Sequence, residues 1–309
     1  MTRASDPRVA GTGPFHARMR GWIVGVGALV LLALTVQMAL VVLETGLPRV
    51  DHLARQAPRR TSLMRAREAE ARRGGRTYHV DRRWVPYGRI SPLLRRAVLI
   101  AEDDAFFSHG GLDWTEIGES ARTNLKRGRV LRGGSTISQQ LAKNLYLSEE
   151  RSVARKLKEV VLALRLERAL TKRRIFELYL NLIEWGDGIY GIEAAAQRHF
   201  GVSAAALDAR QAALLAAVIV NPRRFSPTQP SRRIEKRKRM ILIRMMRRGV
   251  LTEDEYRAAL GESRPASGLQ WLFGAPTDSS VPADTMRPEI RSDTAAIVLD
   301  SLPAASRDP

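Results

Sequence analysis

An uncharged run of 22 residues near the N-terminus constrains this chain more than any other feature of its sequence. It covers residues 22–43 and reads WIVGVGALVLLALTVQMALVVL. A helix of that length can cross about 30 Å of hydrocarbon. The run is longer than the apolar segment of about 7 to 15 residues usual in a cleaved signal, and no small-residue cleavage site directly follows it. The sequence therefore predicts one uncleaved transmembrane helix at residues 22–43.

The charges that flank this run bear on its orientation. Arg18 and Arg20 precede it closely, while Arg49 and Arg55 follow it. Positive charge on both sides gives no clear bias. A short N-terminal tail and a long following domain, which can be translocated whatever its charge, favour a cytoplasmic N-terminus. We expect residues 1–21 to form a cytoplasmic tail of a single-pass protein of the cytoplasmic (inner) membrane.

The chain is strongly basic, with 51 Lys and Arg against 32 Asp and Glu and a net charge of +19. Residues 49–96 alone hold fourteen arginines against four acidic residues. This basic segment either lies on anionic lipid head groups or is a solvated, partly helical linker. We place the juxtamembrane linker at residues 44–83. Nucleic acid is a poorer match, because Tyr78, Trp84 and Tyr87 are too few to form a base-stacking platform. The chain has no cysteine, which excludes disulfides, thiolate metal sites and cysteine nucleophiles.

Helical periodicity dominates the sequence after Trp84, so we predict a mainly α fold for residues 84–262. An apolar content of 44% is sufficient for a sizeable core. Capping residues and apolar spacing predict helices at 92–102, 113–126, 151–169, 172–184, 208–219 and 231–248, and one in the Ala-rich stretch after residue 191. The helix at 231–248 is basic, and we expect its apolar face to consist of Ile234, Met240, Ile241 and Met245. Residues 263–309 are rich in Pro, Ser, Asp and Ala and are predicted to form a disordered tail.

Glu102 stands at the end of a predicted amphipathic helix. Leu94, Val98 and Glu102 fall at steps of four, on one helix face. A carboxylate at the inner end of an apolar stripe is desolvated, which raises its pKa and suits it to proton transfer near neutral pH. The alternative is an ordinary glutamate that ends a helix.

A Gly- and Arg-rich loop at residues 127–134 precedes another helix start. Its glycine spacing approaches that of a phosphate loop, but Gly134 stands where that motif needs lysine, and no strand precedes it. A nucleotide-binding loop is therefore excluded. Ser135 and Thr136 can cap the following helix, whose free N–H groups favour an anion, and Lys143 would add a positive charge.

A second glutamate, Glu159, lies in the long amphipathic helix predicted at 151–169. Arg155 precedes it by four residues on the same face, while Leu162 and Leu166 carry the apolar side. The pair alone favours a surface salt bridge, and a functional contact is the alternative.

Several uncommon strings follow one another at short spacings in a fixed order. They are Ile100–Gly111 (IAEDDAFFSHGG), Arg132–Asn144 (RGGSTISQQLAKN), Arg155–Glu159 (RKLKE), Lys172–Asn181 (KRRIFELYLN) and Ala213–Pro222. Together they resemble the five motifs of peptidoglycan glycosyltransferases. The strings WVPY at 84–87, EWGDGIYGIEAAAQ at 184–197 and NPRRF at 221–225 resemble the monofunctional, membrane-anchored members. The resemblance covers roughly residues 84–249, and the Ser-x-x-Lys and Lys-Thr-Gly signatures of a transpeptidase are absent from the sequence.

The resemblance implies a lysozyme-like helical glycosyltransferase domain with a smaller membrane-proximal lobe, on the extracytoplasmic face of the membrane. It implies polymerisation of lipid II into linear glycan strands by inverting transfer, with release of undecaprenyl pyrophosphate. In this family Glu102 corresponds to the general base, and Glu159 to a glutamate that orients phosphates or a bound cation. The resemblance assigns substrate binding to Ser135, Thr136, Gln140, Lys143, Asn144, Arg151, Arg155 and Lys156.

The same resemblance bears on cofactors and partners. No cofactor is expected to be required, and a divalent cation, Mg²⁺ or Mn²⁺, is left open, with no residue assigned as a metal ligand. The expected partners are lipid II, the growing lipid-linked strand and membrane lipid, whereas nucleic acid is not expected. Contact with cell-division or elongation proteins is left open.

Two departures from the family pattern concern His199, where many relatives have tyrosine, and Asp104, at a position often basic or polar. Two other functions compete with glycosyl transfer: a lysozyme-type or lytic enzyme that cleaves glycan, and a non-catalytic envelope scaffold. Cleavage has no pyrophosphate to neutralise, so it leaves the cations around the acidic pair unexplained. A scaffold gives no reason for two glutamates in matching motifs.

Overall fold

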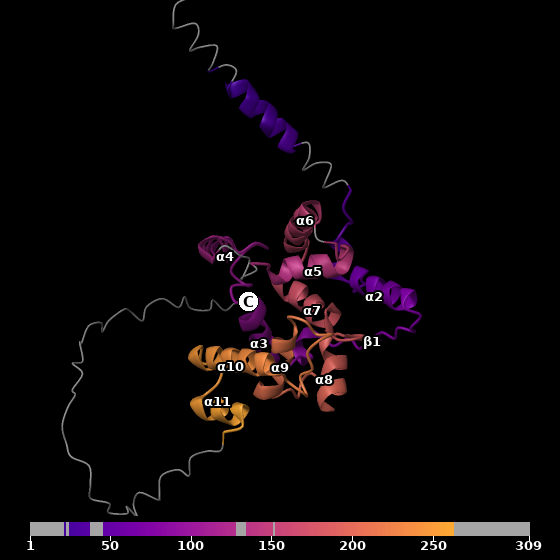
Figure 1. The fold of residues 1–309 in the computed structure, drawn as a ribbon, viewed down its shortest axis with the longest axis vertical. Coiled ribbons are helices and arrows are strands. Elements are labelled where there is room, and N and C mark those ends of the chain that lie inside the picture. Colours follow the sequence, from indigo (N-terminus) through magenta and orange to yellow (C-terminus); the bar gives the residue numbers. More distant parts are fainter. Residues whose placement is uncertain (1–21, 23–24, 38–45, 128–133, 151, 263–309) are drawn as a thin grey trace, which may run out of the picture. The chain divides into compact units, whose positions relative to one another are not determined.

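The structure is a computed structural model and describes residues 22, 25–37, 46–127, 134–150 and 152–262 (Figure 1). Residues 25–37, inside the predicted membrane span, are helical. Within the described ranges, no helix combines the length and the apolar character that crossing a membrane requires. The remainder of that span, residues 23–24 and 38–43, lies outside the described residues, and so do the predicted cytoplasmic tail and the predicted disordered tail.

The described chain after residue 46 is mainly helical, as the sequence predicts. Its elements in order are η1 (Asp51–Ala54), α2 (Ser62–Arg73), β1 (Asp81–Arg82), η2 (Tyr87–Arg89), α3 (Pro92–Glu102), α4 (Trp114–Arg127), α5 (Ile137–Tyr146), α6 (Val153–Ala169), α7 (Lys172–Leu182), β2 (Glu184–Gly186), β3 (Ile189–Tyr190), α8 (Ile192–Phe200), α9 (Ala209–Val218), α10 (Arg232–Arg247) and α11 (Glu253–Leu260). The predicted helices are confirmed to within a few residues at their ends.

Side-chain caps explain where several of these helices begin. Thr136 and Gln139 form a reciprocal capping box at the start of α5, and Asp208 does the same with the residue three positions later at the start of α9. Ser91 occupies the N-cap of α3, but its hydroxyl donates to the Leu207 carbonyl at 2.9 Å instead of capping the helix. Ser91 thus ties the start of α3 to the chain just before α9.

The helices form two packed groups that share one hydrophobic core. In Figure 1, α3 lies against α9 and α10, and α5 lies against α6 and α7. Buried residues of both groups belong to the same apolar cluster. Burial of this apolar surface stabilises the arrangement by about 25 cal/mol per Å². The C-terminal end of α3 and the N-terminal end of α5 are thereby held at fixed positions, and the candidate site lies between them.

A small sheet, which the sequence does not predict, lies at the C-terminal end of α7. β3 pairs in parallel with β1 and antiparallel with β2. The Asn181 amide accepts from the Val85 N–H and donates to the Val85 carbonyl, both at 2.9 Å. Gly191 has φ +80°, and a Cβ at this position would lie 2.8 Å from the Asn181 carbonyl oxygen. Strands of two or three residues are too short to show alternation, which is why periodicity misses them.

Part of the segment expected to form a linker packs onto this helical region. Val50 and Leu53 are buried in the common core, and Met64 of α2 is fully buried. Arg67 of α2 donates to the Glu184 carboxylate at 3.3 Å. Residues 50–73 therefore contribute both apolar and ionic contacts to the fold.

Helix α10 has the predicted apolar face, with one correction. Ile234, Ile241 and Met245 are buried, but Met240, which we assigned to the same face, is 38% exposed. Six residues correspond to about 600° of helical rotation, which places Met240 about 120° around the helix from Ile234. Met240 therefore belongs to the polar side of α10.

Candidate active site

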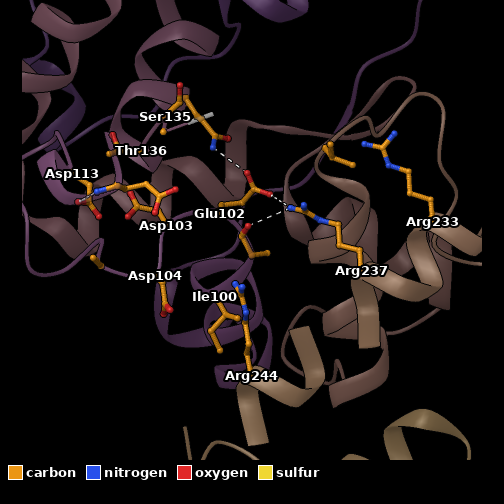
Figure 2. Close-up of a pocket in the computed structure, with 16 residues that line it drawn as sticks. Ile100, Glu102, Asp103, Asp104, Asp113, Ser135, Thr136, Arg233, Arg237 and Arg244 are labelled. Atoms are coloured by element: carbon orange, nitrogen blue, oxygen red, sulfur yellow. Dashed lines mark hydrogen bonds and ion pairs between the residues drawn. The ribbon is translucent and has the colours of Figure 1, made fainter. Parts of the chain in front are cut away.

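A cavity of about 740 Å³ opens where the end of α3, the start of α5 and one side of α10 meet. Four of the predicted site residues line it: Glu102, Ser135, Thr136 and Gln140. Figure 2 shows Glu102 in the middle, with the labelled aspartates on the left, Arg233 and Arg237 on the right, and Arg244 below it. The acidic residues of the lining are Asp103, Asp104, Asp113 and Glu116, and the arginines are Arg233, Arg237 and Arg244.

Both carboxylate oxygens of Glu102 have a fixed hydrogen-bond partner. Its side chain is 13% exposed, and its Oε1 accepts from Nη2 of Arg237 at 2.6 Å. Its Oε2 accepts from Nε2 of Gln140 at 3.1 Å. The buried Tyr179 hydroxyl donates to Oε1 of Gln140 at 2.9 Å, which turns the amide N–H₂ towards Glu102. Each carboxylate oxygen has two lone pairs, so one on each oxygen stays available to a proton.

Burial raises the pKa of Glu102, and the charge of Arg237 and the hydrogen bond from Gln140 oppose this rise. This raised pKa agrees with the expectation that a carboxylate at the end of the apolar stripe is desolvated. Leu94 and Val98, the other members of the stripe, are fully buried. Burial also raises the pKa of Tyr179 well above its usual value, so its hydroxyl stays a hydrogen-bond donor. The site thus holds a desolvated carboxylate with a defined orientation.

Asp103, the next residue, joins the end of α3 to the start of α5. Its buried carboxylate accepts from the Ile137 N–H at 2.9 Å and from Nε2 of His109 at 3.0 Å. Nδ1 of His109 accepts from the Gly111 N–H at 3.1 Å, so the proton of a neutral imidazole is on Nε2, facing Asp103. We expected free N–H groups at the start of α5 to bind an anion. The anion found there is the carboxylate of Asp103, which accepts the hydrogen bond from one of these N–H groups.

Thr136 is buried, and its hydroxyl donates to the Gly111 carbonyl at 2.7 Å. The same oxygen accepts from the Gln139 N–H as the cap of α5. Gly111 has φ +98°, a conformation that glycine adopts without strain. Thr136 thus fixes the loop before α4 against α5, and both its hydrogen-bonding functions are used within the fold.

The second predicted glutamate lies in its own ionic cluster at the start of α6. Glu159 has a side chain that is 4% exposed, and its Oε2 accepts from Arg155 at 2.7 Å. Its Oε1 accepts from Nζ of Lys156, which also donates to the Ser135 hydroxyl at 3.0 Å. The pair is therefore not a surface salt bridge. Ser135 lines the main cavity, so it connects this cluster to the environment of Glu102.

Two further predicted residues stand apart from the cavity. Lys143 and Asn144 follow Gln140 on α5 at three and four positions, are half-buried, and do not line the cavity. Lys143 forms no ion pair with any acidic residue in the described ranges. Arg151 lies outside the described residues.

Sequence reasoning missed the contribution of α10. Arg237 reaches Glu102 from 135 positions further along the chain, and Arg233 and Arg244 line the same cavity. These arginines recur at steps of four and seven, so they lie on one side of the helix. That spacing was a signal in the sequence, but it does not indicate what the helix side contacts.

The two departures from the family pattern have separate surroundings. Asp104 lines the cavity and forms an ion pair with Arg248 at the end of α10. His199 is half-buried beside Gly186, and burial lowers its pKa. Its Nε2 has no hydrogen-bond partner in the part of the chain that the structure describes. His199 does not line the cavity.

The described residues contain no group of three or more His, Asp or Glu side chains arranged to hold a metal ion. Both carboxylate oxygens of Glu159 already contact cationic side chains, from Arg155 and Lys156. This donor set does not fit Mg²⁺ or Mn²⁺, so we derive no step through a metal at Glu159.

Comparison with known proteins places these residues in a family. Residues 69–246 match the Transglycosylase family. The chain is 42% identical over 228 residues to the "Biosynthetic peptidoglycan transglycosylase" of Laribacter hongkongensis, covering 74% of this chain and 97% of that protein. It is 45% identical over 216 residues to the protein of the same name from Thiobacillus denitrificans, covering 70% of this chain and 91% of the relative.

Proposed function

The chain belongs to the Transglycosylase family and is a peptidoglycan glycosyltransferase, and from this premise we propose that it polymerises lipid II into linear glycan strands with release of undecaprenyl pyrophosphate. One observation carries the proposal. Glu102 is a buried carboxylate in the main cavity, its pKa is raised by burial, and Arg237 and Gln140 fix its orientation. Those are the properties of a general base.

In the proposed reaction Glu102 takes the proton from the 4-hydroxyl of the acceptor N-acetylglucosamine. The oxygen attacks the anomeric carbon of the donor sugar while the bond from that carbon to the pyrophosphate oxygen breaks. The electron pair of that bond leaves with undecaprenyl pyrophosphate, and the proton stays on Glu102 until solvent removes it. Attack opposite the leaving group inverts the anomeric configuration.

The leaving pyrophosphate gains negative charge in the transition state, and fixed cations lower the energy of that charge. Arg155 and Lys156 supply such cations beside Ser135, at the edge of the cavity that contains Glu102. Glu159 holds both cations in place rather than taking part in bond making. We assign Lys143 and Arg151 to the same function because they match the family's motifs, and for the same reason we keep Asn144 as a substrate-binding residue outside the cavity lining.

We further propose that the catalytic region is a lysozyme-like lobe with a smaller membrane-proximal lobe, anchored by the apolar run at 22–43 with its active site outside the cytoplasm. Donor and acceptor are both lipid-linked in this scheme, so confinement to the bilayer raises their encounter rate with the enzyme. Removal of residues 1–44 should lower the rate on lipid II in vesicles. An unchanged rate would reduce the segment to a targeting signal.

The direct test is Glu102→Gln assayed on purified lipid II, with the products separated by size. The amide keeps the shape of the side chain but cannot act as the base, so turnover should fall about a hundredfold to ten-thousandfold while lipid II still binds. Glu262→Gln, at an exposed glutamate far from the cavity lining, is the control. Wild-type turnover in Glu102→Gln would remove the general-base assignment. Shortening of finished glycan strands without polymer formation would instead identify a glycan-cleaving enzyme.

A further inference from the structure

Helix α10 and its C-cap residue present a row of four arginines on one side. Arg233, Arg237, Arg244 and Arg248 are separated by four, seven and four residues. At 100° per residue these positions lie within about 60° of one another around the helix axis. The four side chains therefore form a single stripe, and we call it the arginine stripe.

Two members of the arginine stripe are neutralised by carboxylates of the chain itself. Arg237 contacts Glu102 at 2.6 Å, and Arg248 forms an ion pair with Asp104. Both acidic partners line the main cavity. The stripe therefore faces the cavity, and each of these two guanidinium groups already binds one carboxylate.

The other two members have no such partner. Arg233 and Arg244 are exposed and line the cavity, yet neither forms an ion pair with an acidic residue in the described ranges. The guanidinium of Arg233 lies 5.7 Å from the ring centre of Phe225, a contact that leaves its N–H groups available. Figure 2 shows Arg233 to the right of Glu102 and Arg244 below it. The cavity wall thus carries two unneutralised cations beyond the one that holds the base.

The separation of these two cations limits what can bind both. Eleven residues of helix correspond to about 16 Å along its axis. A single pyrophosphate is only a few ångströms long, much shorter than this separation of the two backbone positions. An extended peptide covers about 3.3 to 3.6 Å per residue, so about five residues span the distance. The relatives of this chain act, by their name, on peptidoglycan, a glycan that carries peptides.

We propose that Arg233 and Arg244 form a subsite for the carboxylates of the peptide carried by the acceptor glycan. The inference rests on the proposed function. Guanidinium groups can bind carboxylates through two parallel N–H···O bonds, as Arg248 does with both oxygens of Asp104 in the same cavity. Arg237 binds a second carboxylate of this cavity through one such bond, to Glu102. The cations assigned to the donor pyrophosphate lie at the Ser135 edge, while the stripe adjoins Glu102, which must face the acceptor hydroxyl. The peptide contacts would therefore orient the acceptor sugar.

The test compares two forms of lipid II, one with free peptide carboxylates and one with these carboxylates amidated, as acceptors under identical conditions. The wild-type protein should use the free form with a kcat/KM about tenfold higher, since each exposed ionic contact changes affinity by about threefold. In Arg233→Gln/Arg244→Gln this ratio should fall to about one, mainly through KM for the free form. The double variant Arg233→Lys/Arg244→Lys should retain part of the preference for the free form, because it keeps both positive charges.

Arg239→Gln removes the same kind of charge from α10, about 120° away from the arginine stripe, and should keep the wild-type ratio. A wild-type ratio of one would overturn the inference. So would a double variant that loses activity equally on both substrates, since that result points to the pyrophosphate rather than the peptide. If the wild-type protein polymerises neither form, the proposed function itself fails, and this outcome is distinct from polymerisation without discrimination.

Discussion

Replacement of Glu159 by glutamine tests whether this buried carboxylate organises cations or acts in the chemistry. The substitution keeps the size of the side chain but removes its charge. Two contacts are weakened, those with Arg155 and Lys156. Arg155 then becomes a largely buried guanidinium without a carboxylate partner, because its side chain is only 17% exposed.

The two contacts differ in their expected energies. The hydrogen bond to Arg155 is 2.7 Å long and shielded from water, and losing a charged bond of this kind costs about 2 to 3 kcal/mol. Lys156 is 43% exposed, so solvent screens its contact, which contributes about 0.5 to 1 kcal/mol. The free energy of unfolding should therefore fall by about 3 kcal/mol. For a domain of about 200 residues this lowers Tm by about 6 to 12 °C.

The matched measurements are thermal unfolding and lipid II polymerisation at a temperature well below both transitions. We expect the affinity for the donor to fall together with turnover, because freed cations no longer hold a defined position against the pyrophosphate. Glu253→Gln, at an exposed glutamate paired with Arg257 on α11, controls for loss of a surface ion pair. A change in Tm below about 2 °C would refute the energetic argument. Loss of turnover at unchanged donor affinity would show that Glu159 takes part directly in the chemistry.

Two further substitutions probe the surroundings of Glu102. Arg237→Gln removes the cation that opposes the burial-driven rise in the pKa of Glu102. Because the base acts only when deprotonated, activity is lost as pH falls through its pKa, so the acid limb of the kcat/KM profile should move to higher pH; an unmoved limb would contradict the assignment. Asp103→Asn replaces one of the two accepting oxygens that bind Ile137 and His109. We expect a loss of about 1.5 to 3 kcal/mol in unfolding free energy, measured by thermal melting. Because burial and, in addition, the charge of Asp103 raise the pKa of Glu102, the acid limb of the kcat/KM profile should also move to lower pH in this variant.

The helices were predictable because their signals are local. Thr136 with Gln139 caps α5 within four residues, and the apolar spacing of Leu94 and Val98 places Glu102 above a buried stripe. Such patterns need no knowledge of the partner element. The raised pKa of Glu102 follows from the same stripe and is confirmed.

The contacts that could not be predicted all join segments that are distant in sequence. Arg237 lies in a helix whose spacing marks an apolar and a polar side, but nothing local indicates that the polar side meets Glu102. Leu53 and Met64 are isolated apolar residues in an Arg-rich segment, so their burial depends on the surface that receives them. The start of α5 could be recognised as an anion site, yet only the fold shows that Asp103 occupies it.

Tertiary contacts also determine the pKa of Glu102, the proposed base. Burial alone would favour the neutral acid of Glu102, which cannot accept a proton, while a cation in water would stabilise the carboxylate and make it a weaker base. The structure combines the two, since core residues of α3 desolvate the carboxylate and Arg237 of α10 opposes the effect. Neither helix contains both influences. The packing of α3 against α9 and α10 is therefore part of the proposed catalytic apparatus, because it brings burial and charge to bear on one carboxylate.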